Sequence, residues 1–233
     1  MLKRLKRCRL KQLGVVVIAV LGTHHAIAPR ANAVEPAVVP AAIAQDTATV
    51  SPSPQQAIEK FHSGLLEIMK HAKELGFQGR TDKLAPLMQK TFDLDFMASK
   101  TVGRYWRKLS DEDKLRWASI FARFTTANYA GRFTGYTGEK FITVGIEDGK
   151  RGTRVVLTKI VVPDDEDVDL NYRMIERNGT WKVVDVFLNG TVSELALRRS
   201  EYSSALKRDG FEQLVASVET KIEDLKTKGQ IDG

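Results

Sequence analysis

Apolar residues after position 53 recur every three or four residues, which is the spacing of an amphipathic helix. Ser53, Pro54 and Gln56 form a start signal, because serine caps a helix, proline fits its first position and glutamine can bond back to the cap. The apolar face comprises Ile58, Phe61, Leu65, Ile68, Ala72 and Leu75. We expect this helix to end within residues 76–79, a stretch that begins and ends with glycine.

Further helices are predicted near residues 82–91 and 93–102, followed by a long helix from Ser110 to Thr134. Ser110 is a suitable cap, and the three residues after it are acidic, as the helix dipole favours. The apolar face of the long helix comprises Leu115, Ala118, Phe121, Phe124 and Tyr129.

From residue 139 onward, apolar and polar residues alternate with the period of β-strands. The predicted strands span residues 140–146, 153–162, 168–176 and 181–188. Short turns connect them, so neighbouring strands run antiparallel in a meander. The third strand alternates most clearly: one face carries Val168, Leu170, Tyr172 and Met174, and the other carries Asp169, Asn171 and Arg173.

After the last strand, Asn189-Gly190 breaks the pattern, and the next apolar residues return to helical spacing: Val192, Leu195, Ala196 and Tyr202. A second helix begins at Gly210. Helices before and after one sheet predict an α+β fold, in which a four-stranded antiparallel twisted sheet is wrapped by N- and C-terminal helices. We assign residues 54–228 to this single domain.

The N-terminus has the pattern of a secretory signal peptide over residues 1–33. A positively charged segment precedes the apolar run Leu13–Leu21, and Ala31-Asn32-Ala33 supplies the small residues that a cleavage site requires. An uncleaved membrane anchor is the alternative, although nine apolar residues are too few to span a bilayer. Residues 34–53 contain prolines and alanines without a period, and we predict a disordered tether.

Cleavage would change the charge of the protein. The whole chain has 36 basic and 29 acidic residues, a net charge of +7, and seven of the basic residues lie within 1–33. The mature chain is therefore neutral, and its charge gives no argument for nucleic-acid binding. The only cysteine of the whole sequence, Cys8, would be removed with the signal peptide, so the mature chain would contain no thiol.

The mature chain offers few residues for catalysis. His62 and His71 are nine residues apart on one predicted helix, which places them on opposite sides, typical of exposed or partly buried helix residues. Asp93, Asp95 and Asp185 lie near apolar segments, although Asp93 is also suited to capping a helix. Because phosphate-loop, dinucleotide and metal-ligand motifs are missing, we expect no catalytic residues, no metal and no cofactor.

Four features follow one another at the end of the chain: the strand Trp181–Val186 (Trp-Lys-Val-Val-Asp-Val), a Gly190 turn, the helix Ser193–Tyr202 and a final helix opening with Gly210-Phe211. This order resembles the MlaC or toluene-tolerance family of periplasmic phospholipid carriers. A second block supports it: Thr91–Ala98 and Val102–Arg107 resemble the family's Phe-Asp, Met-Ala and Gly-x-Tyr-Trp-Arg run. The sequence of residues 193–202 is more similar to a hopanoid-associated branch of that family.

The resemblance implies a fold, a function and partners. The fold would be similar to the nuclear-transport-factor-2-like cone with a helical subdomain. The function would be that of a periplasmic carrier, a non-enzyme and a monomer, that shuttles a phospholipid or a hopanoid between the inner and outer membranes. The implied partners are an inner-membrane lipid transporter complex and an outer-membrane lipoprotein. A non-lipid adaptor or assembly factor is the alternative, and a ketosteroid-isomerase-like enzyme is the third interpretation.

A lipid carrier must shield apolar tails from water. Two tails of about fifteen methylenes each would cost on the order of 24 kcal/mol if exposed. Aliphatic and aromatic walls suffice for this task. The candidate wall residues are Phe96, Met97, Tyr105, Trp106, Phe121, Phe124, Tyr129, Val144, Leu157, Leu170, Tyr172, Met174, Val184, Val186, Val192 and Leu195. Each of them could equally belong to an ordinary core.

Basic residues are expected to gather at one end of the sheet, where they could meet a phosphate or an anionic surface. They are Lys150, Arg151, Arg154 and Arg177. Solvated charge is the simpler interpretation.

The signal peptide generates a first testable prediction. Expressed with its native N-terminus, the protein should appear in the soluble periplasmic fraction and begin at Val34, because Ala33 ends the cleavage site. N-terminal sequencing and intact mass measurement check this. An intact Met1 recovered in the membrane pellet would contradict both the cleavage and a freely diffusing carrier.

Overall fold

The structure is a computed structural model that describes residues 52–231. The predicted signal peptide and nearly all of the predicted tether lie outside the described residues. Within the described part, no helix is both long enough and apolar enough to cross a membrane.

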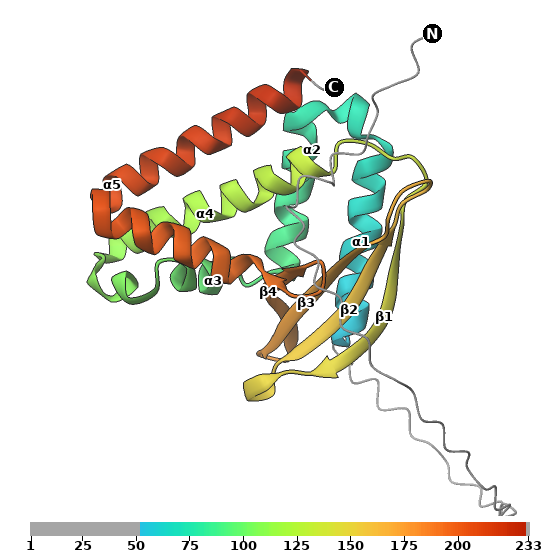
Figure 1. Cartoon of the computed structure of the whole chain (residues 1–233), viewed down its shortest axis with the longest axis horizontal. Coiled ribbons are helices and arrows are strands. Elements are labelled where there is room, and N and C mark those ends of the chain that lie inside the picture. Colours follow the sequence, from blue (N-terminus) through green and yellow to red (C-terminus); the bar gives the residue numbers. More distant parts are fainter. Residues whose placement is uncertain (1–51, 232–233) are drawn as a thin grey trace, which may run out of the picture. The chain divides into compact units, whose positions relative to one another are not determined.

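Helices come first and last in the described part of the chain, with a sheet between them (Figure 1). The helices are α1 (Pro54–Lys70), α2 (Ala72–Thr91), α3 (Leu94–Thr101), the 3-10 helix η2 (Gly103–Lys108), α4 (Asp111–Arg132), the short 3-10 helix η3 (Lys150–Gly152) and α5 (Glu194–Ile231). The strands are β1 (Lys140–Asp148), β2 (Arg154–Val161), β3 (Val168–Arg177), β4 (Thr180–Leu188) and β5 (Val192–Ser193).

The start signal of α1 is confirmed as a capping box. The Gln56 amide donates to Ser53 Oγ at 3.2 Å, and the Ser53 amide donates to Gln56 Oε1 at 2.8 Å. The predicted end of this helix was wrong, because α1 ends at Lys70 and α2 begins at Ala72. Gly76, within the predicted end, has a non-helical backbone with a φ of 58°, so two helical segments of α2 meet there. The second segment includes residues 77–81, ahead of the helix predicted near 82–91, and it buries Phe77 and Arg80.

The prediction of an antiparallel sheet is confirmed, but the sheet has five strands and not four. The order is β1-β2-β3-β4-β5. We predicted Val192 as a helix residue, whereas β5 places it beside Leu188 of β4. The reason is a tight turn: Asn189 and Gly190 adopt φ values of 49° and 73°, and the Thr191 amide donates to the Leu188 carbonyl. The chain therefore doubles back before the helix begins.

One face of the sheet is buried, and we call it the inner face. On β3 it carries Leu170, Tyr172 and Met174, as the alternation predicted. Tyr172 lies opposite Val156 of β2 and Val186 of β4, so these neighbours share that face. β1 and β4 each contain one extra residue, Val144 and Val184 respectively, where the pairing register shifts.

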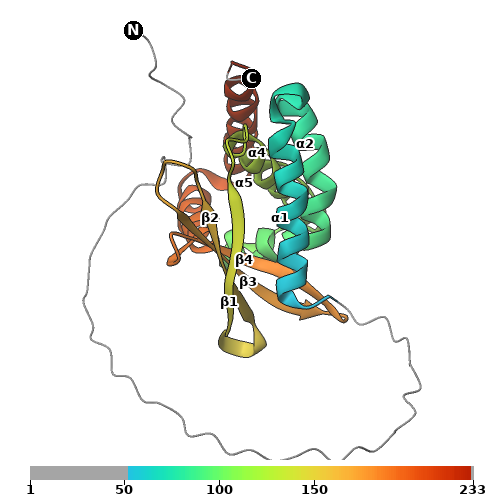
Figure 2. The same cartoon turned by 90° about the vertical axis from the view of Figure 1, so that its right-hand side faces the viewer.

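α1 lies against the inner face, the start of α5 contacts β4 and β5, and α4 and the rest of α5 pack on each other in a second layer (Figures 1 and 2). α5 folds back on itself at Gly210, whose φ of 82° favours glycine. An ion pair between Lys221 and Glu201 joins the two halves. The predicted break at Gly210 is therefore confirmed.

Trp117 of α4 is the centre of the helical layer. It is fully buried, and its indole N–H donates to the Ala98 carbonyl at 3.0 Å. Its ring meets the edges of Tyr202 and Phe211, which come from the two halves of α5 at centroid distances of 5.3 and 6.4 Å. One side chain thus holds α3, α4 and both halves of α5 together.

Asp185 of β4 connects the sheet to α5. Its carboxylate is 3% exposed, accepts from Ser193 Oγ at 2.7 Å and from the Leu195 amide at 3.2 Å, and lies 3.6 Å from Arg173. Burial raises the pKa of Asp185 despite these favourable partners. The carboxylate acts as a cap for the first turn of α5, supplied by a neighbouring strand.

We predict that Asp185→Ala lowers the free energy of unfolding by about 2 kcal/mol, because it removes this cap and leaves buried donors unpaired. Urea denaturation followed by circular dichroism measures the loss. Asp169→Ala is the control, since Asp169 is exposed on β3 and its loss should cost less than about 0.5 kcal/mol. Equal losses in the two variants would contradict the capping role.

Candidate functional site

The largest apolar surface of the sheet is its inner face. β2 contributes Val156 and Ile160, β3 contributes Leu170 and Met174, and β4 contributes Val186. All five are buried, and α1 packs against β1, β2 and β4 over this face, where Tyr129 of α4 also reaches it. This arrangement is a wall of aliphatic side chains enclosed by helices.

An aromatic cluster covers this wall. Phe61 of α1 meets Tyr172 of β3 at a centroid distance of 6.2 Å, Phe92 at 5.2 Å and Tyr129 of α4 at 5.9 Å. Phe141 of β1 extends the cluster along the sheet, where it contacts Phe133 at 6.2 Å. Members of the cluster come from five parts of the chain, so the fold alone brings them together.

A short chain of polar groups runs through the apolar cluster. His62 Nε2 and the Tyr172 hydroxyl are 2.9 Å apart, and Tyr172 also hydrogen-bonds with Tyr129. His62 stacks on Phe141 at 4.3 Å, with 26° between the ring planes. Burial lowers the pKa of His62 to about 3 and raises the pKa values of Tyr129 and Tyr172. All three groups are therefore neutral near pH 7.

The predicted wall residues fall into three groups. The structure buries most of those on the sheet and in the helices: Met97, Phe121, Phe124, Leu170, Tyr172, Met174, Val184 and Val186. Tyr172, Met174, Leu170 and Val186 share the inner face, and Tyr129 reaches it from α4. Phe124 lies in the helical layer, where the Arg198 guanidinium stands 5.0 Å from its ring centroid.

A second group is half-exposed at the surface. Phe96 of α3 lies between two cations, with Lys100 Nζ at 4.8 Å and the Arg177 guanidinium at 5.3 Å from its ring centroid. Tyr105 and Trp106 belong to η2.

The third group does not face the buried wall. Val144 is 64% exposed, because it is the extra residue at the irregular pairing of β1. Leu157 lies on the opposite face of the sheet, because the register that pairs Val156 with Tyr172 turns the next residue outward. Val192 is 42% exposed in β5, and Leu195 is half-buried at the start of α5.

A family model described as MlaC protein matches residues 59–220 of this chain. The chain belongs to the MlaC family. Among solved structures, it is similar to the phospholipid-binding protein from Ralstonia solanacearum, which was solved in complex with a phospholipid. The two share 19% sequence identity and a TM-score of 0.64, over 75% of this chain and 99% of that chain, which establishes a shared fold. No curated protein matches the sequence.

The sequence analysis of this MlaC family member did not predict that two polar residues, His62 and Arg80, are buried. His62 is only 4% exposed, whereas we expected an exposed or partly buried helix residue. Arg80 is buried and donates to the carbonyls of Ala130 and Ala72 at 3.0 and 2.9 Å. One signal for the burial of His62 was available in the sequence. His62 follows Phe61 directly and lies three residues before Leu65, both of which belong to the apolar face of the helix.

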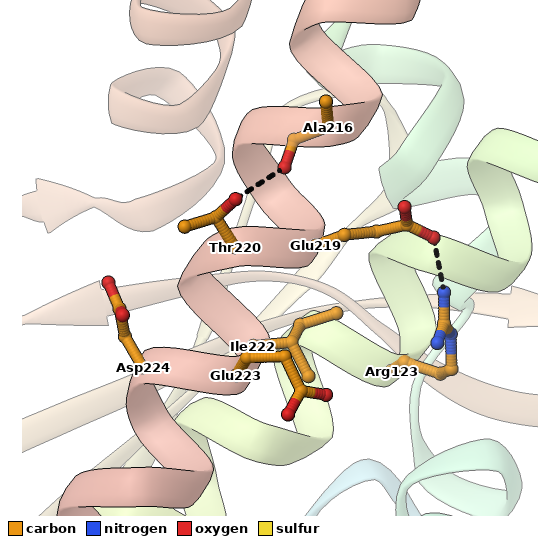
Figure 3. Close-up of a pocket in the computed structure, with 7 residues that line it drawn as sticks. All are labelled: Arg123, Ala216, Glu219, Thr220, Ile222, Glu223 and Asp224. Atoms are coloured by element: carbon orange, nitrogen blue, oxygen red, sulfur yellow. Dashed lines mark hydrogen bonds and ion pairs between the residues drawn. The ribbon is translucent and has the colours of Figure 1, made fainter.

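A pocket of about 520 Å³ lies where α4 meets the second half of α5 (Figure 3). The predicted wall residues are absent from its lining, which comprises Arg123, Ala216, Glu219, Thr220, Ile222, Glu223 and Asp224. Arg123 and Glu219 form an ion pair at 3.1 Å across it. Its charged lining does not suit lipid tails.

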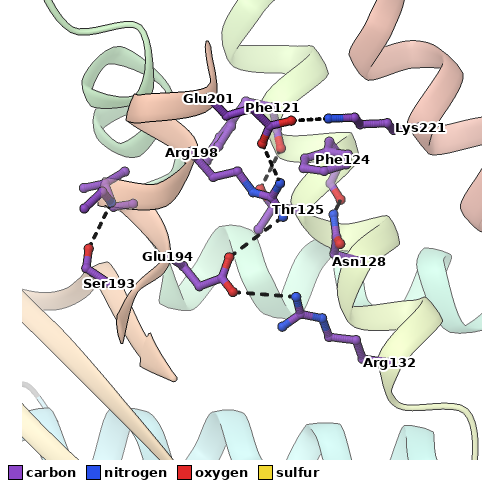
Figure 4. A network of polar contacts seen from close by, with 12 residues as sticks. Phe121, Phe124, Thr125, Asn128, Arg132, Ser193, Glu194, Arg198, Glu201 and Lys221 are labelled. Atoms are coloured by element: carbon purple, nitrogen blue, oxygen red, sulfur yellow. Dashed lines mark hydrogen bonds and ion pairs between the residues drawn. The ribbon is translucent and has the colours of Figure 1, made fainter. Parts of the chain in front are cut away.

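Polar contacts tie the first half of α5 to α4 (Figure 4). Glu194 lies 3.6 Å from Arg132 and 3.8 Å from Arg198, and Arg198 also pairs with Glu201 at 3.1 Å. Glu201 in turn contacts Lys221 of the second half. These pairs position α5 beside the end of α4.

The predicted basic end of the sheet is half neutralised. Arg154 pairs with Asp148 at 2.5 Å, and Arg177 pairs with Asp93 at 3.2 Å. Asp93 also caps α3, because its side chain accepts from the Phe96 amide, as the sequence suggested. Within residues 52–231, no group of three potential ligands could hold a metal ion.

The burial of His62 predicts a pH dependence of stability. The ordinary pKa of histidine is about 6.5, so below that pH the unfolded chain binds a proton that the folded protein rejects until about pH 3. Stability is therefore full above pH 6.5 and declines as the pH falls. Between pH 7 and pH 5, the wild type should lose about 2 kcal/mol more than His62→Gln.

Urea denaturation at the two pH values measures this difference. His71→Gln is the matched control, because His71 is exposed and its replacement should leave the wild-type decline unchanged. A His62→Gln variant that declines as steeply as the wild type would show that His62 is accessible to protons in the folded state.

Proposed function

We propose that the protein is a periplasmic lipid carrier that encloses the tails of a membrane lipid between the inner face of its sheet and the helices over it. One observation carries the proposal. In a chain of the MlaC family, the inner face forms an apolar wall covered by α1, and Tyr129 reaches it from α4.

The wall has the chemistry that tails require. Each methylene removed from water gains roughly 0.8 kcal/mol, so binding needs apolar area and little else. The polar groups in this region, His62, Tyr129 and Tyr172, bond to one another and are neutral. They therefore present no unpaired charge to a tail.

The structural relative supports a lipid as the ligand. The Ralstonia solanacearum protein of the same fold is described as phospholipid-binding and holds a phospholipid. We propose a phospholipid here, with a hopanoid as the alternative, since both would meet the same apolar wall.

Membership of the MlaC family supports a proposal for location and partners. We propose that residues 1–33 direct export, that the mature protein acts as a monomer in the periplasm, and that it exchanges lipid with an inner-membrane transporter complex and an outer-membrane lipoprotein. Shuttling between the two membranes is the task that such an arrangement would serve.

An enzyme is a less well supported function. Asp93 caps α3 and Asp185 caps α5, so two of the three carboxylates considered for catalysis have structural partners. Asp95 is exposed on α3. A non-lipid adaptor is the remaining alternative, and the ligand content of the purified protein separates it from a carrier.

The direct test is organic extraction of the purified mature protein followed by mass spectrometry. A carrier should yield close to one lipid per chain. A protein that is empty and binds no added phospholipid would favour the adaptor.

A pair of matched variants tests which face of the sheet holds the tails. Leu170→Trp adds bulk to the inner face and should remove most of the bound lipid, at a cost of about 1–3 kcal/mol in stability from overpacking. Leu157→Trp makes the same change on the opposite face and should leave the bound lipid unchanged. Mass spectrometry measures the lipid, and thermal denaturation verifies that both variants fold. The reverse outcome, with lipid lost only in Leu157→Trp, would move the site to the outer face.

A further inference from the structure

The 3-10 helix η2 carries a cluster of basic and aromatic side chains that the proposed wall does not use. We define the η2 patch by its members: Arg104, Tyr105, Trp106, Arg107 and Lys108 of η2, and Arg199 of α5. The four cations are exposed, and the two aromatic residues are half-exposed. The patch therefore combines positive charge with aromatic surface at one place on the protein.

Contacts within the patch hold its members together. The Arg104 guanidinium and Lys108 Nζ lie 5.3 and 5.9 Å from the centroid of Tyr105. The Arg199 side chain lies directly beside the start of η2, where a Cβ built on Gly103 would be 3.2 Å from Arg199 Nε. Two segments almost 100 residues apart in the chain thus meet at one surface.

The cations of the patch are unpaired. Among residues 52–231, Arg104, Arg107, Lys108 and Arg199 form no ion pair, although cations elsewhere do, such as Arg116 with Glu212 at 2.9 Å. Unpaired, exposed guanidinium and ammonium groups are free to contact anionic phosphates. The patch therefore has its charge available for a partner.

The nearest acidic segment does not neutralise it. In the first turn of α4, Asp111 pairs with Lys114 at 2.8 Å, and Asp113 accepts a hydrogen bond from Ser110 Oγ at 2.8 Å. Only Glu112 of that turn has no such contact with a described residue.

We infer that the η2 patch is a docking surface for an anionic membrane. Tyrosine and tryptophan favour the interface between water and bilayer, because their rings are apolar at one end and polar at the other. Basic residues beside them are attracted to acidic headgroups. The inference goes beyond the carrier proposal, since it concerns where the protein meets a bilayer and not what it encloses.

Vesicle co-sedimentation of the mature protein tests the inference. The probes are vesicles of phosphatidylcholine alone and vesicles of phosphatidylcholine mixed with phosphatidylglycerol. The wild type should bind the anionic vesicles much better than the neutral ones. Binding should weaken when salt is raised from about 0.1 M to about 1 M, because the screening length falls from about 10 Å to about 3 Å.

The triple variant Arg104→Gln, Arg107→Gln, Lys108→Gln should bind anionic vesicles on the order of 100-fold more weakly, since each basic residue near such a surface contributes roughly fivefold. The matched control is Lys60→Gln, Lys73→Gln, Lys83→Gln. It removes the same charge from exposed positions of α1 and α2 and should bind like the wild type.

Tryptophan fluorescence gives a second measurement that does not depend on charge. Anionic vesicles should shift the emission of the wild type to shorter wavelength, because Trp106 leaves water. The shift should disappear in Trp106→Phe, because Trp117 is buried and the half-exposed Trp181 lies on β4, outside the patch.

Three results would overturn the inference: a wild type that ignores anionic vesicles, a triple variant that binds them normally, or an emission shift that persists in Trp106→Phe. The first result would assign the patch to an acidic surface of a protein partner. Lipid extracted from the triple variant separates the two proposals. An undiminished lipid content with lost vesicle binding supports both, whereas a wild type that never contains lipid counts against the carrier alone.

Discussion

The inner face of the sheet is apolar and must be kept out of water, and the position of α1 over it follows from this requirement. Burying it also buries the Tyr172 hydroxyl, which would be costly without a partner. His62 from α1 and Tyr129 from α4 meet this need. The hydrogen bonds therefore specify which helix faces which part of the sheet, while the apolar contacts supply most of the stabilisation.

Two layers with different chemistry result. Next to the sheet, contacts are aromatic and neutral. In the helical layer, Trp117 provides the apolar centre, and the pairs Arg116–Glu212 and Arg123–Glu219 lie at its surface. Exposed ion pairs of this kind contribute little stability, so the second half of α5 depends mainly on its contacts with Trp117 and its neighbours. A lipid that enters between sheet and helices would exchange one set of apolar contacts for another and leave this outer layer in place.

Much of this arrangement follows from local patterns. Alternation in residues 168–176 identified the inner face of β3. Successive side chains of a strand point to opposite faces of the sheet, and the face that carries Asp169, Asn171 and Arg173 is too polar to be the buried one. Glycine at 210 predicted the break in α5. Other features depend on distant residues. Val155, Val156 and Leu157 are all apolar, so only the register with β3 decides that Leu157 faces outward. His62 is buried by Tyr172, 110 residues away, and a two-residue strand such as β5 has no pattern to detect.

The irregular pairing at Val144 has a consequence for self-association. Among the described strands, β1 pairs only with β2, and its exposed Ile142, Val144 and Ile146 would make a regular strand an attractive template for a strand of another molecule. The extra residue interrupts the spacing of free amide and carbonyl groups along this edge and increases its twist. An incoming strand cannot bond continuously past that point, so the irregular pairing disfavours edge-to-edge association through these exposed apolar residues.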